Sequence, residues 1–385
     1  MDIDLKKLLC LATLLIQPAC ADLIDDLGSE AARLRQLSYK KVPNKRDSQE
    51  FVSNYVGKAV DKEMKGPSVR RRELFLKDFK LMKSGASLAG TYKILLKDQV
   101  RGLYDPDTKS YLVVKGGSSA GIERMLMNMY SFMGLQFENV LTVHELDHAI
   151  QDQHFNLKKL QKSVEGNWDR ELALQSLVEG DASSVMTDYL FDQMGQPRPR
   201  NVEMPPVTGS PAVDSAPIYF RDGLIVPYLQ GQAFVDYLRE WGGWQSVNAA
   251  YRKLPASSEQ ILHPKKYFND QPVEVKINLP GLPGYKNLGQ DTAGEFVIRC
   301  WGRENDVWRG LAAGWGGDRF QTWESPSDHY TLWESRWDSA QDAKEFADFA
   351  RPRLSARDNL LIDGQRVQIW LNVPSQLAKD RTRFL

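Results

Sequence analysis

The sequence predicts a helix-rich α+β fold, and two kinds of segment support this prediction. The first kind is long, lacks Pro and Gly, and carries apolar residues at the spacing of one helix face, as in residues 139–154. The second kind is short, apolar and next to a turn sequence, as in residues 110–114, and is typical of a strand. Because the helical segments cover more of the chain, we expect helices to dominate.

The first 21 residues predict an export signal that is removed before the protein folds. Two lysines precede a short apolar run at residues 8–16, and Ala19–Ala21 has the small residues of a cleavage site. We therefore expect a secreted or periplasmic protein. Lipid attachment at Cys20 is the alternative, and we rank it lower because Gln17, three residues earlier, is not aliphatic.

The composition of residues 22–385 argues against several classes of partner. The chain has 50 basic and 50 acidic residues, and acidic residues lie near the basic runs, so we expect neither nucleic acid nor an anionic membrane surface as a partner. No later stretch approaches the ~20 apolar residues of a transmembrane helix, so we expect no integral membrane segment. Cys300 is the one cysteine left after cleavage, and we expect it to be a buried, unpaired residue. The sequence makes no prediction of oligomeric state.

The predicted elements fall into an N-terminal part, residues 22–120, and a larger C-terminal part, residues 121–385. In the N-terminal part we expect helices at 22–37 and 48–82, the second interrupted near Gly66 and Pro67, and strands at 92–104 and 110–114 joined by the turn sequence 105–108. In the C-terminal part we expect helices at 121–155 and 167–194, a Pro-rich loop at 195–217, helices at 228–241 and 245–253, a strand at 273–278, a helix at 292–308, alternating segments at 319–323 and 329–337, a helix at 340–349 and a strand at 367–371.

The segment from 139 to 154 contains the motif H-E-x-x-H, with His144, Glu145 and His148 as its defining residues. Residues four apart lie one turn apart on the same helix face, so the two imidazoles can bind one zinc ion. The glutamate beside the first histidine can then accept a proton from a water molecule on that ion. We therefore predict a zinc site with Glu145 as the catalytic base.

Two other interpretations of this motif are weaker. An ordinary exposed helix face would carry Lys or Arg, and the polar face that contains the two histidines has none. A di-iron carboxylate site would need a second Glu-x-x-His on another helix. Gln151, Gln260 and Pro326 occupy that offset before the remaining histidines, so the sequence offers no such motif.

The third zinc ligand is expected on the next helix, in the segment L-V-E-G-D-A that contains Glu179, 31 residues beyond His148. With this spacing the chain resembles the gluzincins, the thermolysin-like zinc peptidases. It is similar over residues 139–185 to uncharacterised secreted bacterial proteins with H-E-L-x-H-A-x-Q-D-Q and L-V-E-G-D-A. The resemblance implies a zincin-like domain with a mixed C-terminal part, and it implies Glu179 as the ligand. Ser183 departs from the pattern, since those enzymes usually have Asp there.

Two aspartates are expected near the ligands. Asp181 falls within the apolar stripe of its helix, where a carboxylate must be paired or bind metal, so it is either a partner of a ligand histidine or the third ligand in place of Glu179. Asp152 lies one turn beyond His148 and either accepts its second ring N–H or is solvated. The choice between these roles stays open.

Hydrolysis also needs a group that stabilises the oxyanion. His263 and Tyr267 are the first candidates because the segment 259–267 also resembles the bacterial proteins. Arg319 and His329 follow them.

These observations predict a secreted zinc-dependent peptidase that acts on a peptide or protein substrate. Two alternatives from other classes are a non-catalytic exported protein with a structural zinc site and a protein that binds a polymer through a Trp-rich surface. Six of the ten tryptophans lie between Trp301 and Trp337. We expect these tryptophans to form core, because Trp buries a large apolar area.

Overall fold

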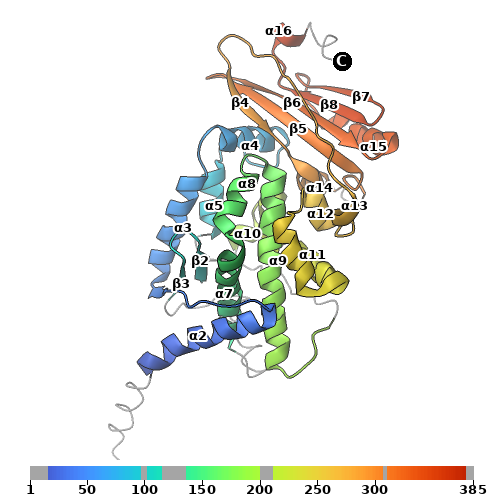
Figure 1. Cartoon of the computed structure of the whole chain (residues 1–385). Helices are drawn as coiled ribbons and strands as arrows, with labels where there is room; N and C mark the ends of the chain where they lie inside the picture. The colour runs from blue at the N-terminus through green and yellow to red at the C-terminus, as the bar shows by residue number, and fades with distance from the viewer. Residues whose placement is uncertain (1–15, 97–101, 115–135, 200–210, 307–309, 379–385) are drawn as a thin grey trace, which may run out of the picture.

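The computed structural model describes the chain from α2 to α16 with gaps (Figure 1). The described residues are 16–96, 102–114, 136–199, 211–306 and 310–378. Helices form the lower part of the molecule in Figure 1, and a five-stranded sheet with flanking helices forms the upper part. The prediction of a helix-rich α+β fold is therefore confirmed. Within the described ranges, no helix has the length and apolar character needed to cross a bilayer.

The helical part is built around α9 (Trp168–Gln193), which packs against α7 (Phe137–Phe155) and α11 (Ile218–Arg252). Buried apolar side chains of these three helices and of α2 (Ile16–Arg35) form one core. The other helices of this part are α3 (Gln49–Glu63), α4 (Pro67–Asp78), α5 (Leu88–Leu96), α8 (Leu157–Val164), α10 (Pro211–Asp214), α12 (Ser258–Leu262) and α13 (Lys266–Asn269).

Helices α9 and α11 touch through their backbones at two glycines. A Cβ atom added to Gly180 would lie 2.1 Å from the carbonyl carbon of Gly231, and one added to Gly231 would lie 2.1 Å from the carbonyl oxygen of Ser176. No side chain fits at either position. The glycine in the V-E-G-D segment therefore brings the two helices together at the turn that carries Glu179.

We expect Gly180→Ala to destabilise the protein by about 1–3 kcal/mol, because backbone atoms cannot move aside as a flexible side chain can. Gly57→Ala in α3 is the matched control, since a Cβ there meets nothing within 4 Å. The control should stabilise the protein by about 0.5–1 kcal/mol through helix propensity. Urea denaturation measures both, and an unchanged midpoint for Gly180→Ala would contradict the close packing.

A small three-stranded sheet lies beside α7. Strand β3 (Ser110–Val114) is central and pairs in parallel with β1 (Asn44–Asp47) and antiparallel with β2 (Gly102–Asp105). The order β1-β3-β2 leaves β2 at the edge of the sheet that contacts α7. The expected hairpin is confirmed in its turn and second strand.

The upper part is an antiparallel sheet in the order β4-β5-β6-β8-β7. Its strands are β4 (Lys286–Asp291), β5 (Trp315–Glu324), β6 (His329–Trp337), β7 (Asn359–Asp363) and β8 (Arg366–Leu371). The accompanying helices are α14 (Gly294–Glu304), α15 (Ala340–Ala350), the 3₁₀ turn η1 (Arg351–Arg353) and α16 (Ser375–Ala378).

Four of the five described tryptophans between Trp301 and Trp337 lie in the core, as expected, and Trp323 is partly buried. Trp301, Trp315, Trp333 and Trp337 are each at most 4% exposed and pack with apolar residues of α4, α14 and α15. Trp308 lies outside the described residues. Cys300 is also buried, and burial raises the pKa of its thiol well above the usual value.

Two strand predictions were wrong. The segment 92–104 begins inside the helix α5, and within the described residues its strand is limited to 102–104, part of β2. The segment 273–278 belongs to no strand, although Val275 and Ile277 are buried and alternate with exposed residues. The predicted helices at 228–241 and 245–253 correspond to α11, with non-helical backbone at Gly242 and Gly243.

Two predicted boundaries lie at or beyond the limits of the described residues. The expected cleavage point after Ala21 falls inside α2, and residues 1–15 lie outside the described part. The predicted helix at 121–155 is described from residue 136 onward.

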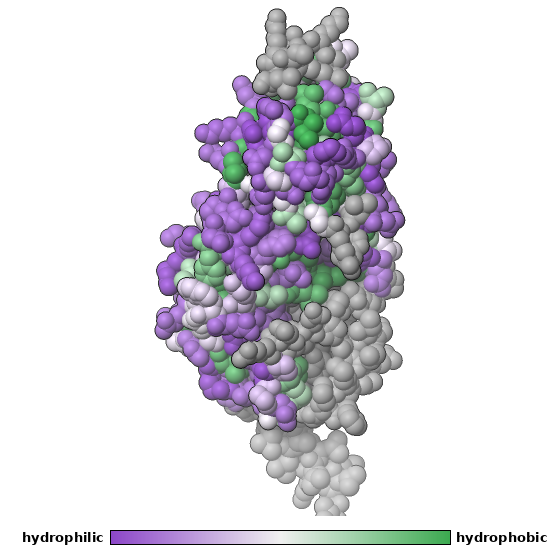
Figure 2. All heavy atoms as spheres, turned by 90° about the vertical axis from the view of Figure 1, so that its right-hand side faces the viewer, coloured by the Kyte–Doolittle hydropathy of each residue, from purple (hydrophilic) through white to green (hydrophobic). Residues whose placement is uncertain are grey.

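The face on the right of Figure 1 is mostly hydrophilic, with hydrophobic residues in small separate groups (Figure 2).

Candidate metal centre

Helix α7 supplies the two histidines. One side of the helix is fully buried, with Val143, Leu146 and Ala149 each 0% exposed in the core. This apolar side fixes the rotation of the helix, so His144 and His148 project from the other side. Their ring centroids are 4.8 Å apart, and the rings are nearly perpendicular. The helix predicted around H-E-x-x-H is confirmed.

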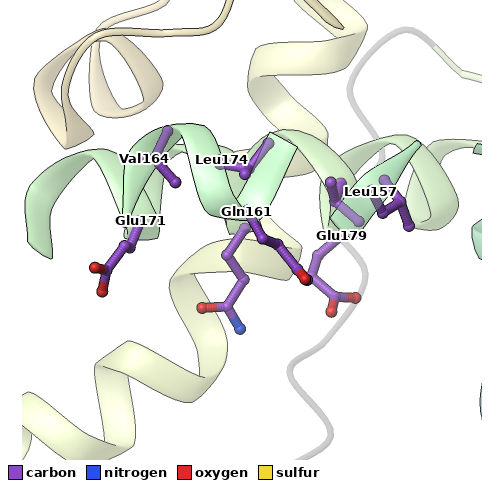
Figure 3. A pocket seen from close by; sticks show the side chains of 8 residues that line it. Leu157, Gln161, Val164, Glu171, Leu174 and Glu179 are labelled. Carbon is purple, nitrogen blue, oxygen red and sulfur yellow. The ribbon is translucent and has the colours of Figure 1, made fainter. Parts of the chain in front are cut away.

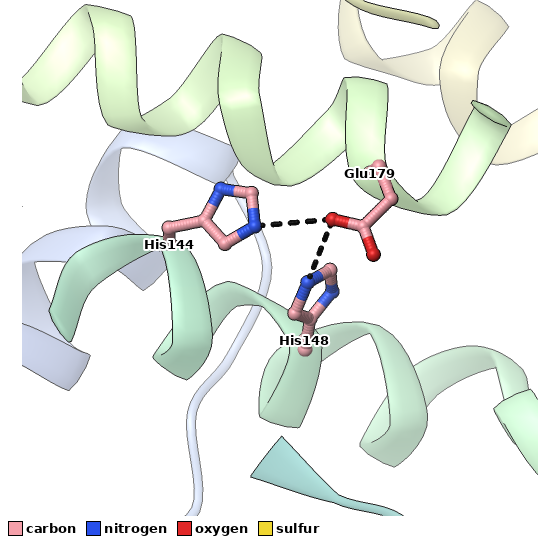
Figure 4. A group of neighbouring side chains, drawn as sticks. All are labelled: His144, His148 and Glu179. Atoms are coloured by element: carbon pink, nitrogen blue, oxygen red, sulfur yellow. Dashed lines mark hydrogen bonds and ion pairs between the residues drawn. The ribbon is translucent and has the colours of Figure 1, made fainter. Parts of the chain in front are cut away.

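Helix α9 brings Glu179 to the same point (Figure 4). The side chain of Asn167 caps the start of this helix by accepting the backbone N–H of Arg170 at 3.1 Å. Oε2 of Glu179 lies 3.2 Å from Nε2 of His144 and 3.4 Å from Nε2 of His148. The carboxylate therefore lies between the two rings, as Figure 4 shows.

This set of atoms fits a zinc ion. Two imidazole nitrogens and one carboxylate oxygen are the three protein ligands of many catalytic zinc sites, whose fourth position is open. Bonds of about 2.0–2.1 Å in a tetrahedral site put neighbouring ligand atoms about 3.3 Å apart. The two distances to Glu179 agree with that value, and one ligand atom from each of the three residues lies within 4.8 Å of the others.

The charges of the three side chains are strongly coupled. Burial opposes ionisation of Glu179, yet the two imidazoles hold its pKa well below the usual range. Burial likewise opposes a charged ring at His148, but Glu179 raises the pKa of that ring to about 10. The carboxylate thus stays negative and attracts a positive charge, which is the electrostatic condition for binding a cation.

Glu145 lies between the histidines in sequence and contacts the edge strand β2. Its Oε2 accepts the backbone N–H of Tyr104 at 2.8 Å. Burial raises the pKa of its carboxyl group, while the nearby imidazoles oppose that rise. A carboxylate with a raised pKa beside an open metal position is suited to accept and return a proton.

Gln151, rather than Asp152, is the partner of His148. The Nδ1 atom of His148 lies 3.0 Å from Oε1 of Gln151, so the ring N–H donates to the amide. The amide N–H₂ of Gln151 donates to Asp147 at 2.7 Å and to the carbonyl of Val178 at 3.0 Å, which fixes its orientation. In metal sites such a partner orients the histidine ring that is a ligand.

The predicted bond between Asp152 and His148 is wrong, and Asp152 has other partners. It accepts the hydroxyl of Tyr104 and the backbone N–H of Leu157, both at 3.0 Å. It therefore joins β2 and the start of α8 to α7. The ring of His148 is satisfied by Gln151, one residue earlier on the helix.

Asp181 is the buried partner of Arg35 and not a metal ligand. Nε and Nη2 of Arg35 donate to its two oxygens at 2.7 and 3.0 Å, and the hydroxyl of Tyr251 donates at 2.9 Å. Both charged side chains are 0% exposed. The prediction that this buried carboxylate must be paired or bind metal is confirmed, because Arg35 pairs with it. Asp147 lies close to this pair, and burial together with the charge of Asp181 raises its pKa to about 8.

We expect Arg35→Ala to destabilise the protein by about 3–5 kcal/mol, because it leaves the carboxylate of Asp181 buried without its cation. Arg33→Ala on the same helix is the control, since its ion pair with Glu30 is exposed and should contribute about 1 kcal/mol or less. Urea denaturation compares the two variants. Equal stabilities would refute the importance of the buried pair.

The residues predicted to stabilise an oxyanion contact residues other than the three clustered candidate ligands. Nε2 of His263 lies 3.0 Å from Glu295, and the hydroxyl of Tyr267 donates to the carbonyl of Lys253 at 2.7 Å. His329 bonds Asp78 at 2.9 Å, and Arg319 lies on β5. None of these contacts involves the three clustered residues. His263 and Tyr267 instead connect α12 and α13 to α14 and α11.

Tyr228 on α11 is, with Gln151, a residue beside this cluster that the sequence did not predict. Its ring stacks on His144 with centroids 5.8 Å apart. The negative charge of nearby Glu179 raises the pKa of this phenol well above its usual value. The side chain is 41% exposed, so a ligand can reach it. The sequence predicted its helix but carried no signal that singled out this position.

Comparisons with known proteins give one partial match. A family model described as a domain of unknown function (DUF8575) matches residues 283–383. This range runs from β4 to α16 and excludes His144, His148 and Glu179. No curated protein matches the chain. Nor does any solved structure match it.

Proposed function

We propose that the chain is an exported zinc-dependent peptidase of the zincin type. The observation that carries the proposal is the meeting of His144, His148 and Glu179 from two helices, with Glu145 next to the first histidine. Three ligands leave one coordination position for water and substrate, which distinguishes catalytic from structural zinc sites. Among the described residues, this group contains three candidate ligands and no fourth.

The proposed reaction uses residues of both helices. When bound, zinc acts as a Lewis acid and lowers the pKa of a water molecule to about 7. Oε2 of Glu145 is held by the N–H of Tyr104, and we assign Oε1 to the attacking water. Glu145 takes the proton from that water and then returns it to the leaving amine. We assign the hydroxyl of Tyr228, whose ring stacks on His144, as a donor to the developing oxyanion.

The edge strand β2 supports a peptide as the substrate. In an antiparallel pair the N–H and C=O of one residue point the same way and alternate along the strand. Because the N–H of Tyr104 points to Glu145, the backbone groups of Tyr104 and Gly102 face away from β3. The N–H of Tyr104 is taken by Glu145, and an extended peptide could pair with the outward groups of Gly102 and the carbonyl of Tyr104, which would bring its scissile bond to Glu145.

The alternatives have less support. A structural zinc site would need a fourth protein ligand to close it. A tryptophan-rich binding surface would need exposed rings, whereas Trp315 and Trp333 are 1% and 2% exposed.

A peptide-library digestion with and without a chelator tests the proposed function. We expect cleavage by the zinc-loaded protein, loss of cleavage with the chelator, and recovery on addition of zinc. A library left intact by zinc-loaded protein would contradict the proposal.

We expect Tyr228→Phe to lower kcat by about 10²–10³-fold with little change in zinc content, because the ring still stacks on His144 but one donor to the oxyanion is lost. Tyr237→Phe on the same helix is the control, since its ring lies against Phe268. Steady-state kinetics compares the two. An unchanged kcat for Tyr228→Phe would remove this residue from the proposed mechanism.

A further inference from the structure

The five-stranded sheet contributes no residue to the candidate metal centre. The groove next to that centre lies between α8 and α9, and Figure 3 shows Gln161, Glu171 and Glu179 in its lining. Every residue that lines this groove belongs to the helical part, and so do the three clustered residues. Any role of the sheet in binding a partner therefore resides in its own surface.

The two edge strands of the sheet, β4 and β7, differ in their protection. Bulges and covering elements protect the edges of natural sheets, because unpaired N–H and C=O groups can pair with another strand. In β4 the register shifts between Asn287 and Gln290, and a guanidinium N–H of Arg71 on α4 donates to the carbonyl of Leu288. β7 pairs with β8 without a register shift, and its residues 360–362 are Leu, Leu and Ile. β7 is thus the less protected edge.

The turn between β7 and β8 decides which backbone groups of β7 point outward. Asp363 pairs with Arg366 across a two-residue turn, in which the carbonyl of the first residue accepts the N–H of the fourth. Because such pairs alternate along an antiparallel ladder, Asp363 and Leu361 face β8. The N–H and C=O groups of Leu360 and Ile362 therefore point away from the sheet. Among the described residues, no backbone group outside the sheet bonds to them.

A second copy of the chain fits this edge. When two β7 strands run antiparallel with Leu361 opposite Leu361, Leu360 of each copy lies opposite Ile362 of the other. These are the residues with outward N–H and C=O groups, so each pair exchanges both of its hydrogen bonds. The same register places the carboxylate of Asp363 opposite the amide of Asn359, which can donate to it, and no like charges of the two strands lie opposite each other. The strand is therefore complementary to itself.

We propose that the protein forms a two-fold dimer in which the β7 edges of two copies pair and the two sheets become one. A two-fold contact of this kind is closed, because each copy uses the same edge once. Figure 1 shows β7 at the margin of the sheet opposite β4, the strand that contacts α4. The pairing uses no residue of the candidate metal centre, so the dimer does not depend on the proposed peptidase activity.

Sedimentation velocity over a concentration series, with hydrogen exchange on the same samples, tests the dimer. We expect a monomer–dimer equilibrium in which the N–H groups of Leu360 and Ile362 exchange fast in the monomer and slowly in the dimer. The N–H of Leu361 faces β8 and should exchange slowly in both. A protein that stays monomeric at every concentration, or a dimer in which both outward amides still exchange fast, would overturn the proposal.

Ile362→Lys should raise the Kd of the dimer by about tenfold or more, because a lysine on an edge strand opposes pairing with a second strand. The side chain of Ile362 is 40% exposed, so the fold should be retained. Ile94→Lys on α5 is the matched control, with the same change at a position that is 66% exposed and outside the sheet. The control should keep the wild-type Kd. Equal values of Kd for the two variants would contradict pairing through β7.

Leu361→Cys tests the register of the dimer. Residues opposite each other in a pair without hydrogen bonds have Cα atoms about 4.5 Å apart, which a disulfide can bridge. Mild oxidation should therefore link Leu361→Cys into a covalent dimer, whereas Asp363→Cys, which lies opposite Asn359, should stay at the wild-type background. Cys300 is buried and remains in all three proteins. Equal cross-linking of the two variants, or none in Leu361→Cys, would overturn the proposed dimer.

Discussion

Glu145→Gln is expected to lower peptide hydrolysis by about 10²–10⁴-fold while zinc content stays at the wild-type level. The amide is almost the same size as the carboxylate and can still accept the N–H of Tyr104. It cannot accept a proton from water, so the base is lost while His144, His148 and Glu179 remain in place. Kinetics and elemental analysis of the same preparation measure the two quantities.

Glu138→Gln is the matched control for this substitution. Glu138 lies on the same helix, is exposed, and is absent from the cluster of candidate ligands. Its activity should equal that of the wild type. A Glu145→Gln protein that kept full activity would contradict the role assigned to Glu145.

His148→Ala is expected to weaken zinc binding by more than about 100-fold. Loss of a group that only orients a ligand costs about 10–100-fold in metal affinity, and loss of a ligand should cost more. Titration against a chelator of known affinity measures the change. His154→Ala on the same helix is the control, because its Nε2 contacts the carbonyl of Ser38 at 2.8 Å. Wild-type affinity in His148→Ala would mean that this ring does not bind the metal.

The sequence was sufficient for the two histidines because their geometry is local. Residues four apart on one helix must share a face, and no tertiary information is needed to say so. The position of Glu179 beside the histidines depends on how α7 packs against α9. The sequence indicated this position only through the resemblance to the gluzincins. The choice between Glu179 and Asp181 depended on Arg35, whose guanidinium reaches Asp181 from α2, 146 positions away in the chain.

Partners supplied by distant helices were beyond sequence reasoning. Tyr228 reaches His144 because α9 and α11 are in backbone contact at Gly180 and Gly231, and no local pattern reports that contact. Gln151 was overlooked in favour of Asp152 because a carboxylate is the commoner partner of a metal-bound histidine. The amide is held there by Asp147 and the carbonyl of Val178, which belongs to α9.

The wrong strand predictions also have physical reasons. A short apolar run such as residues 92–96 fits a strand and a buried helix equally well, and packing decides between them. In residues 273–278 buried and exposed residues alternate, and the N–H of Val273 donates to the carbonyl of Gly316 in β5 at 2.7 Å, but the backbone groups beyond it bond to side chains. Gln290 donates to the carbonyl of Ile277 at 2.9 Å, and Gln321 accepts the N–H of Leu279 at 3.0 Å. Strands β1 and β4 were not predicted, because polar residues such as Lys45 and Arg46 hide the pattern of a strand. Strand β7 was also not predicted, although its centre is apolar.

A crystal structure of the zinc-loaded protein with anomalous scattering at the zinc edge tests the central claim most directly. We predict one strong peak per chain, about 2.0–2.2 Å from Nε2 of His144, Nε2 of His148 and a carboxylate oxygen of Glu179, with water at the fourth position. A peak elsewhere, or a fourth protein side chain that closes the site, would contradict a catalytic centre built from these three residues.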